Sequence, residues 1–146
     1  MARYTAGTRS TGAGTAARPI GGLMAVASRS CYLLEVGCFN TTTTAFPLRL
    51  AKITAAGTPG TGLTEEKYNT NDDAPDMTAF DTWSADATIS AGNIRIATLG
   101  AAIGAGVIWT FAYPGIFIPA AAANGVGLVG SGGAGQICDW YMEWEE

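Results

Sequence analysis

The residues that carry out chemistry in most enzymes are scarce in this chain of 146 residues. It has no histidine, which excludes Ser-His-Asp and Cys-His nucleophile systems and removes the commonest zinc ligand. The three cysteines, Cys31, Cys38 and Cys138, show no C-x-x-C spacing, so they predict neither a zinc site nor a redox motif. Cys31 and Cys38 fall in one predicted strand, roughly 23 Å apart and beyond disulfide reach. We therefore expect free, buried thiols.

Acidic side chains cluster between residues 65 and 86, and two adjacent pairs stand at 65–66 and 72–73. Paired carboxylates are the catalytic groups of glycosidases. Both pairs fall in stretches typical of exposed loops, where a raised acid pKa is hard to arrange. The oxygen-bearing side chains from Asn69 to Asp76 also suggest a calcium loop, but the central glycine and distal glutamate of an EF-hand are missing. We favour a solvated acidic turn, and we predict a protein that is not an enzyme and has no cofactor or metal.

The aromatic side chains offer the remaining candidates for binding. Exposed aromatic rings could form a platform for carbohydrate; the candidates are Trp83, Trp109, Tyr113, Trp140 and Trp144. Tryptophans that alternate along strands more often lie in the core. We therefore favour a structural role for these rings.

The elements that position these side chains are strands, and the clearest is at residues 136–146. Large apolar side chains occupy every second position there, which predicts one buried face made of Cys138, Trp140, Met142 and Trp144. The opposite face carries Asp139, Tyr141, Glu143 and Glu145. Because no amphipathic helix is available to cover the tryptophans, a second sheet or another subunit must do so.

Short strands separated by turn residues account for the rest of the chain. They are predicted at 23–27, 30–40, 46–51, 78–83, 94–100, 106–113, 116–118 and 125–130, with a turn at 131–135 before the last strand. Within 30–40 we expect Tyr32, Leu34, Val36 and Cys38 to share one face. This spacing predicts an all-β fold, a jelly-roll-like β-sandwich of about eight strands.

Residues 1–18 differ from the remainder of the chain because they contain almost nothing to bury. Their Gly, Thr, Ala and Arg content predicts a flexible basic N-terminal arm, followed by a single β-sandwich domain over 19–146. Charged residues make up only 14% of the chain, against roughly 25% in an ordinary soluble domain. The surface is then rich in small residues that pack closely against a neighbour, so the composition favours a permanently assembled protein.

Net charge and hydropathy exclude two classes of partner. A net charge of −4 without a basic patch on the domain argues against nucleic acid. Residues 20–28 mimic a signal peptide, but the apolar stretch is short and contains two glycines. Residues 96–138 carry no charge, yet glycines and prolines interrupt them and 107–113 alternate with period two. We predict neither export nor contact with a membrane.

Two blocks of sequence carry a family resemblance. They are 35–54 (EVGCFNTTTTAFPLRLAKIT) and 115–146 (GIFIPAAAANGVGLVGSGGAGQICDWYMEWEE). Together they resemble small virion structural proteins of tailed bacteriophages, in particular capsid decoration (cement) proteins with a jelly-roll-like fold. The resemblance implies a viral structural protein made in the host cytoplasm and located on the capsid surface of the virion. There it would bridge subunits of the major capsid protein lattice, as a homo-oligomer for which a homotrimer is favoured.

The resemblance also suggests which residues make contact. Arg3, Arg9 and Arg18 of the arm would pair with capsid carboxylates, while Asp139, Tyr141 and Glu143 would face a capsid or subunit neighbour. The alternative is a phage tail or head-fibre adhesin domain that binds host-surface glycan through exposed tryptophans.

Overall fold

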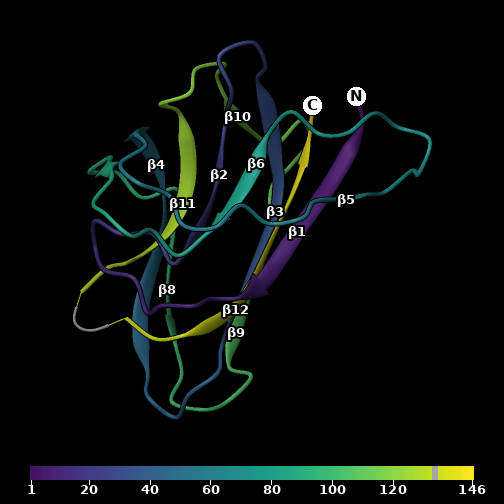
Figure 1. Cartoon of the computed structure of the whole chain (residues 1–146). Coiled ribbons are helices and arrows are strands. Elements are labelled where there is room, and N and C mark those ends of the chain that lie inside the picture. Colours follow the sequence, from purple (N-terminus) through teal and green to yellow (C-terminus); the bar gives the residue numbers. More distant parts are fainter. Residues whose placement is uncertain (133–134) are drawn as a thin grey trace.

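A computed structural model describes residues 1–132 and 135–146 (Figure 1). The described residues form twelve strands and no helix, and the strands make two antiparallel sheets packed face to face. The predicted all-β, jelly-roll-like sandwich is confirmed, with about twelve strands rather than eight. The strands that the sequence did not predict are β1 (Arg3–Arg9) and the two-residue β5 (Glu66–Lys67) and β7 (Thr88–Ile89).

The first sheet, sheet A, contains both terminal strands. Its order is β10-β3-β12-β1-β5, and β9 pairs with β3 beside β10. Besides β1 and β5, its strands are β3 (Cys31–Asn40), β9 (Gly106–Thr110), β10 (Ile116–Ile118) and β12 (Cys138–Glu145). Figure 1 shows β1 and β12 side by side, with the two chain ends at the same end of the sheet.

The second sheet, sheet B, has the order β6-β2-β11-β4-β7, with β8 pairing β4 beside β7. Besides β7, its strands are β2 (Gly21–Met24), β4 (Phe46–Ala55), β6 (Thr78–Asp81), β8 (Arg95–Leu99) and β11 (Gly125–Gly130). The first four strands of the chain alternate between sheets A and B, and so do β10, β11 and β12. This repeated crossing gives the sandwich its jelly-roll character.

The core lies between the inner faces of the two sheets. β12 buries Cys138, Trp140, Met142 and Trp144, as its alternation predicts, and turns its other side chains outward. The inner face of sheet B covers them with side chains that include Leu23, Leu48, Leu50 and Leu128. The tryptophans are therefore covered by the chain's own second sheet.

The alternation predicted for residues 30–40 breaks at Leu34. Glu143 pairs with Glu35 and Trp144 with Leu33, so a register shift leaves Leu34 as an extra residue in β3. Such a bulge changes which side chains face the core. Val36 is buried as expected, whereas Tyr32 is only half-buried and packs against Phe117.

The structure corrects the expectation of a flexible arm for residues 3–9. These residues form β1, which pairs with β12 along its whole length and with β5 on its other side. Tyr4 and Ala6 point into the core, and Arg3 and Arg9 point outward. The strand escapes sequence analysis because only these two inward side chains mark it, and one of them is alanine.

The predicted turn at 131–135 includes residues 133–134, which lie outside the described residues. Among the described residues there is no helix of a length and apolarity that could span a membrane.

Candidate functional site

The outer face of sheet A gathers most of the residues that the sequence predicted for contact. The register of β1 on β12 brings Arg3 beside Glu145 and Arg9 beside Asp139. Five of the six predicted side chains lie on this face, namely Arg3, Arg9, Asp139, Tyr141 and Glu143. Arg18 lies outside the sheets and pairs with Asp86, with 2.7 Å from Nε to Oδ1.

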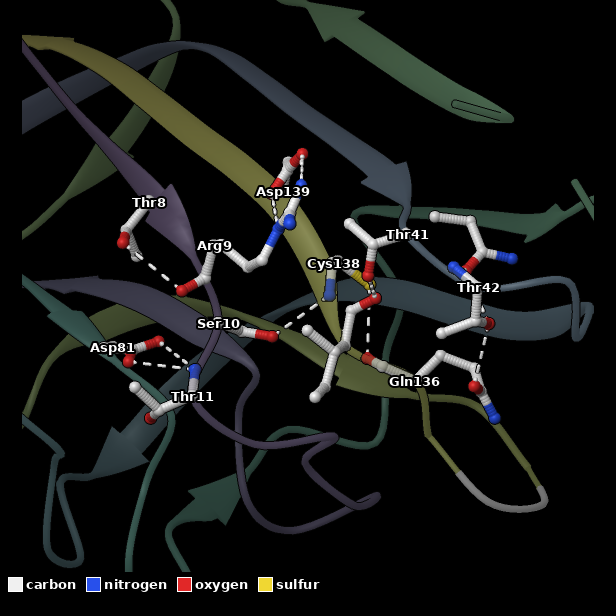
Figure 2. Close-up of polar contacts among 12 residues, drawn as sticks. Thr8, Arg9, Ser10, Thr11, Thr41, Thr42, Asp81, Gln136, Cys138 and Asp139 are labelled. Carbon is white, nitrogen blue, oxygen red and sulfur yellow. Dashed lines mark hydrogen bonds and ion pairs between the residues drawn. The ribbon is translucent and has the colours of Figure 1, made fainter. Parts of the chain in front are cut away.

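The two outward arginines of β1 bind carboxylates of the same chain. Arg9 holds Asp139 with two parallel hydrogen bonds, Nε to Oδ1 at 2.8 Å and Nη2 to Oδ2 at 2.9 Å (Figure 2). The hydrogen bond from Arg9 lowers the pKa of Asp139. Arg3 donates to Glu145 Oε1 at 3.0 Å. Exposed ion pairs of this kind add little to the stability of the fold.

Polar contacts fix the start of β12 beneath this surface (Figure 2). The Ser10 hydroxyl accepts a hydrogen bond from the Cys138 amide at 3.1 Å. Ser10 is in turn followed by Thr11, whose amide donates to Asp81 Oδ2 at the end of β6 at 3.1 Å. On the other side, the Thr41 hydroxyl donates to the Ile137 carbonyl at 2.6 Å. The backbone just before Asp139 is therefore held by Ser10 on one side and by Thr41 on the other.

A second polar group centres on Glu35, which the sequence analysis did not single out. The Tyr141 hydroxyl donates to Glu35 Oε1 at 2.6 Å, and the Thr110 hydroxyl donates to Oε2 at 2.7 Å. These two donors stabilise the ionised carboxylate and lower the pKa of Glu35. Burial, followed by the hydrogen bond to Glu35, raises the pKa of Tyr141.

Two glycines make room for Tyr141 on the sheet. Tyr141 pairs with Gly7 of β1 on one side and with Gly37 of β3 on the other. A Cβ at Gly37 would lie 2.1 Å from Tyr141 Cε1, and a Cβ at Gly7 would lie 2.8 Å from Tyr141 Cβ. The phenol ring therefore lies flat across β3, and this placement brings its hydroxyl to Glu35.

A depression of about 180 Å³ opens beside this network. Its polar lining comes from Arg3, Glu35, Thr110, Tyr113 and Glu143, so it spans β1, β3, β12 and the end of β9. Glu35 and Glu143 are direct neighbours across the strand pair. The low pKa of Glu35 keeps it ionised at neutral pH, which suits the binding of a cationic or hydroxyl-bearing group and does not suit a general acid.

The tryptophans do not form an exposed platform. Trp83, Trp140 and Trp144 are buried, and Trp109 is half-buried on the inner side of β9. Three of the five side chains proposed for glycan binding are thus in the core, as the structural interpretation predicted. Among the five aromatic side chains proposed for glycan binding, Tyr113 is the one that is exposed.

The acidic loop lies at the far end of sheet A from β9. Asp72, Asp73 and Asp76 line a cavity of about 290 Å³ together with Arg29 and Glu146. The Glu146 carboxylate accepts hydrogen bonds from the amides of Asp76 at 2.7 Å and Met77 at 3.1 Å, while burial raises its pKa. Within residues 1–132 and 135–146, no group of three or more acidic or thiol side chains is placed to hold a metal ion. The cavity offers charged lining but no assembled calcium site.

The three thiols are free and buried, as expected. Burial raises the pKa of Cys31 to about 12, and the interaction with the Cys138 thiol, followed by burial, raises the pKa of Cys38. Thiols of this kind are poor nucleophiles at neutral pH.

The fold and this face together define a small all-β sandwich module whose polar groups are arranged on a sheet surface. Comparisons of the chain with protein-family models, with curated proteins and with solved structures gave no match.

Proposed function

We propose that this chain is a virion structural protein that decorates the outside of a phage capsid and stabilises it by bridging major capsid subunits. The proposal starts from the resemblance of residues 35–54 and 115–146 to capsid decoration proteins. Those two blocks cover most of β3 and β4 and all of β11 and β12, which are inner strands of the two sheets, together with the edge strand β10. A protein that binds an assembled lattice but not its free subunits stabilises that lattice by mass action.

The observation that carries the proposal is the outer face of sheet A. It presents ionised side chains from β1, β3 and β12 on one surface, each held by a neighbour in the same sheet. Such a surface is preorganised for contact with a rigid partner, because its side chains are already ordered. Two of the three predicted basic contact residues, Arg3 and Arg9, thus lie on the sheet, and contact through them does not require a loose arm.

The position on the particle is tested by imaging purified virions by cryo-electron microscopy and by counting copies of the chain by quantitative mass spectrometry. Hundreds of copies on the head support decoration. A few copies at the tail, together with glycan binding on an array, would replace it with the adhesin alternative.

The contact face is tested by cosedimentation with expanded capsids that lack the protein. Arg9→Glu places a carboxylate beside Asp139 and should lower capsid occupancy at least tenfold, a free-energy change of about 1.4 kcal/mol or more. Lys52→Glu makes the same change of charge on the exposed surface of β4, in sheet B, and should leave occupancy unchanged. Equal occupancy for Arg9→Glu and the wild type would exclude this face.

A further inference from the structure

One edge of sheet A carries half of the exposed apolar side chains. Eight large hydrophobic side chains are exposed among the described residues, and four of them lie on or beside β9 and β10, namely Ile103, Ile108, Tyr113 and Phe117. Ile96 is also exposed, but it is on β8 of sheet B and is not part of this edge. No charged residue occurs from 96 to 138, although the Arg95 guanidinium lies over the Phe111 ring just beyond β9. An exposed apolar patch of this kind marks a surface that another molecule covers.

The backbone of β9 is open along this edge. The Ala105 carbonyl accepts a hydrogen bond from the Asn40 amide at 2.7 Å, and the Phe111 amide donates to the Leu34 carbonyl at 2.9 Å. The odd-numbered residues from 105 to 111 therefore direct their backbone N–H and C=O groups toward β3. In an antiparallel ladder the alternate residues direct theirs the other way. The N–H and C=O groups of Gly106, Ile108 and Thr110 therefore point outward, where the described strands include no second partner for β9.

This edge also lacks the usual protection against pairing. Natural edge strands carry charges, prolines or bulges that prevent association. The sequence of β9, GVIWT, has no charge and no proline, and its pairing with β3 runs without a register shift. At the opposite edge of sheet A, β5 consists of Glu66 and Lys67. An unprotected strand on one edge only indicates that β9 has a partner.

We infer that β9 pairs with β9 of a second copy of this chain, antiparallel and about a two-fold axis at Ile108. This register sets Ile108 opposite Ile108 of the second copy and Gly106 opposite Thr110. All three residues have outward backbone groups, so every open N–H and C=O of β9 meets its complement. A self-complementary strand edge of this kind gives an isologous dimer in which sheet A continues from one copy into the other.

The side chains fit the same register. On the outer face, Ile108 contacts its counterpart, and the glycine opposite Thr110 leaves space for the Thr110–Glu35 hydrogen bond. On the inner face, Val107 lies opposite Trp109, which gives an apolar cross-strand pair. Ile103 and Tyr113 are 74% and 76% exposed, and they lie five residues before and five residues after Ile108. The two-fold axis therefore brings Ile103 of one copy toward Tyr113 of the other copy.

The strand itself favours a second copy as the occupant, because the residues with outward backbone groups, Gly106, Ile108 and Thr110, are placed symmetrically about Ile108 and so meet the same residues of an identical chain. Two chains with a net charge of −4 repel each other, but β9 itself carries no charged residue that would add to this repulsion at close range. The inference does not depend on the proposed capsid role, because it uses only the geometry and charge of this edge.

The full chain is tested by analytical ultracentrifugation over a range of concentrations. We expect a dimer, and we expect Ile108→Lys to raise its dissociation constant at least tenfold, because two ammonium groups would then face each other. The control is Ile96→Lys, which makes the same change on β8 of the other sheet. Ile96 is 59% exposed and Ile108 is 52% exposed, so the two sites are comparable, and the Ile96→Lys protein should still dimerise. A monomeric wild type, a trimer, or equal loss of association in both variants would overturn the inference.

Oxidative cross-linking tests the register separately. Opposed residues in a hydrogen-bonded antiparallel pair have Cα atoms about 5.5 Å apart, which is within disulfide reach. Ile108→Cys should therefore form a covalent dimer on mild oxidation, whereas Ile96→Cys should not; the three native thiols are buried. An Ile108→Cys protein that folds, by circular dichroism, but stays uncross-linked would reject this register.

Discussion

Replacing Trp144 separates two contributions of one buried side chain. The indole is fully buried and packs on Tyr4, with ring centroids 6.0 Å apart. Trp144→Ala removes this packing and leaves a cavity, so it should lower the free energy of unfolding by about 3–5 kcal/mol. The Nε1–H of Trp144, however, has no acceptor among the described residues. A buried unpaired donor costs about 1–3 kcal/mol.

Trp144→Phe should therefore lower the free energy of unfolding only slightly for the number of atoms it removes, because it removes the unpaired donor together with part of the ring. We expect a loss of about 1 kcal/mol or less, the relief offsetting most of the lost packing. Trp83→Phe is the matched control, since Trp83 is equally buried but its Nε1–H donates to the Ala56 carbonyl at 2.6 Å. Losing that hydrogen bond should make Trp83→Phe about 1–2 kcal/mol more costly than Trp144→Phe.

Urea unfolding followed by far-ultraviolet circular dichroism measures all three variants without relying on tryptophan fluorescence. An equal loss of stability in Trp144→Phe and Trp83→Phe would show that the Trp144 Nε1–H is not an unpaired donor. A fully stable Trp144→Ala protein would refute the assignment of the buried face itself.

Three further predictions concern Tyr141, Glu35 and the thiols. Gly37→Ala should lower the free energy of unfolding by about 1–3 kcal/mol, because its Cβ meets the Tyr141 ring; a double-mutant cycle with Tyr141→Ala should recover much of the loss, and strict additivity would contradict the contact. The low pKa of Glu35 means that its stabilising effect is complete above the unfolded pKa of about 4.3 and is lost as pH falls through the folded value. Tyr141→Phe removes a donor and should shrink the loss of stability between pH 7 and pH 3 in urea unfolding; an unchanged loss counts against the network. Iodoacetamide at pH 8 should leave Cys31 and the other two thiols unmodified in the folded protein and label all three in urea, as mass spectrometry would show.

The sequence predicts β12 well because its inward side chains are large and alternate without a break. The same signal is weak in β1, where Tyr4 and Ala6 are the buried pair. Its partner strand is about 130 residues away, as the Arg9–Asp139 pair illustrates. A strand whose stability comes mainly from its neighbour cannot be recognised from local pattern.

The site shows a similar division between local and long-range information. The alternation along β12 is enough to predict that Asp139, Tyr141 and Glu143 point outward. Glu35 could be placed on a strand, but its donors come from Tyr141 and from Thr110, 106 and 75 residues away. The role of Gly37 also depends on the register of β3 against β12, which a bulge at Leu34 shifts. Register is a property of the folded sheet, so side-chain types alone do not fix it.

The pairing of β1 with β12 has a consequence for how the protein folds during synthesis. β12 is a central strand of sheet A, with β3 on one side and β1 on the other. Until the ribosome has released residues 138–145, β1 therefore lacks its main partner and β3 keeps an open edge. Sheet A cannot form by sequential addition of strands, so its completion must follow translation of β12. Topologies closed by such distant segments fold slowly, and a ribosome stalled before β12 would leave a chain that exposes the core of the sandwich.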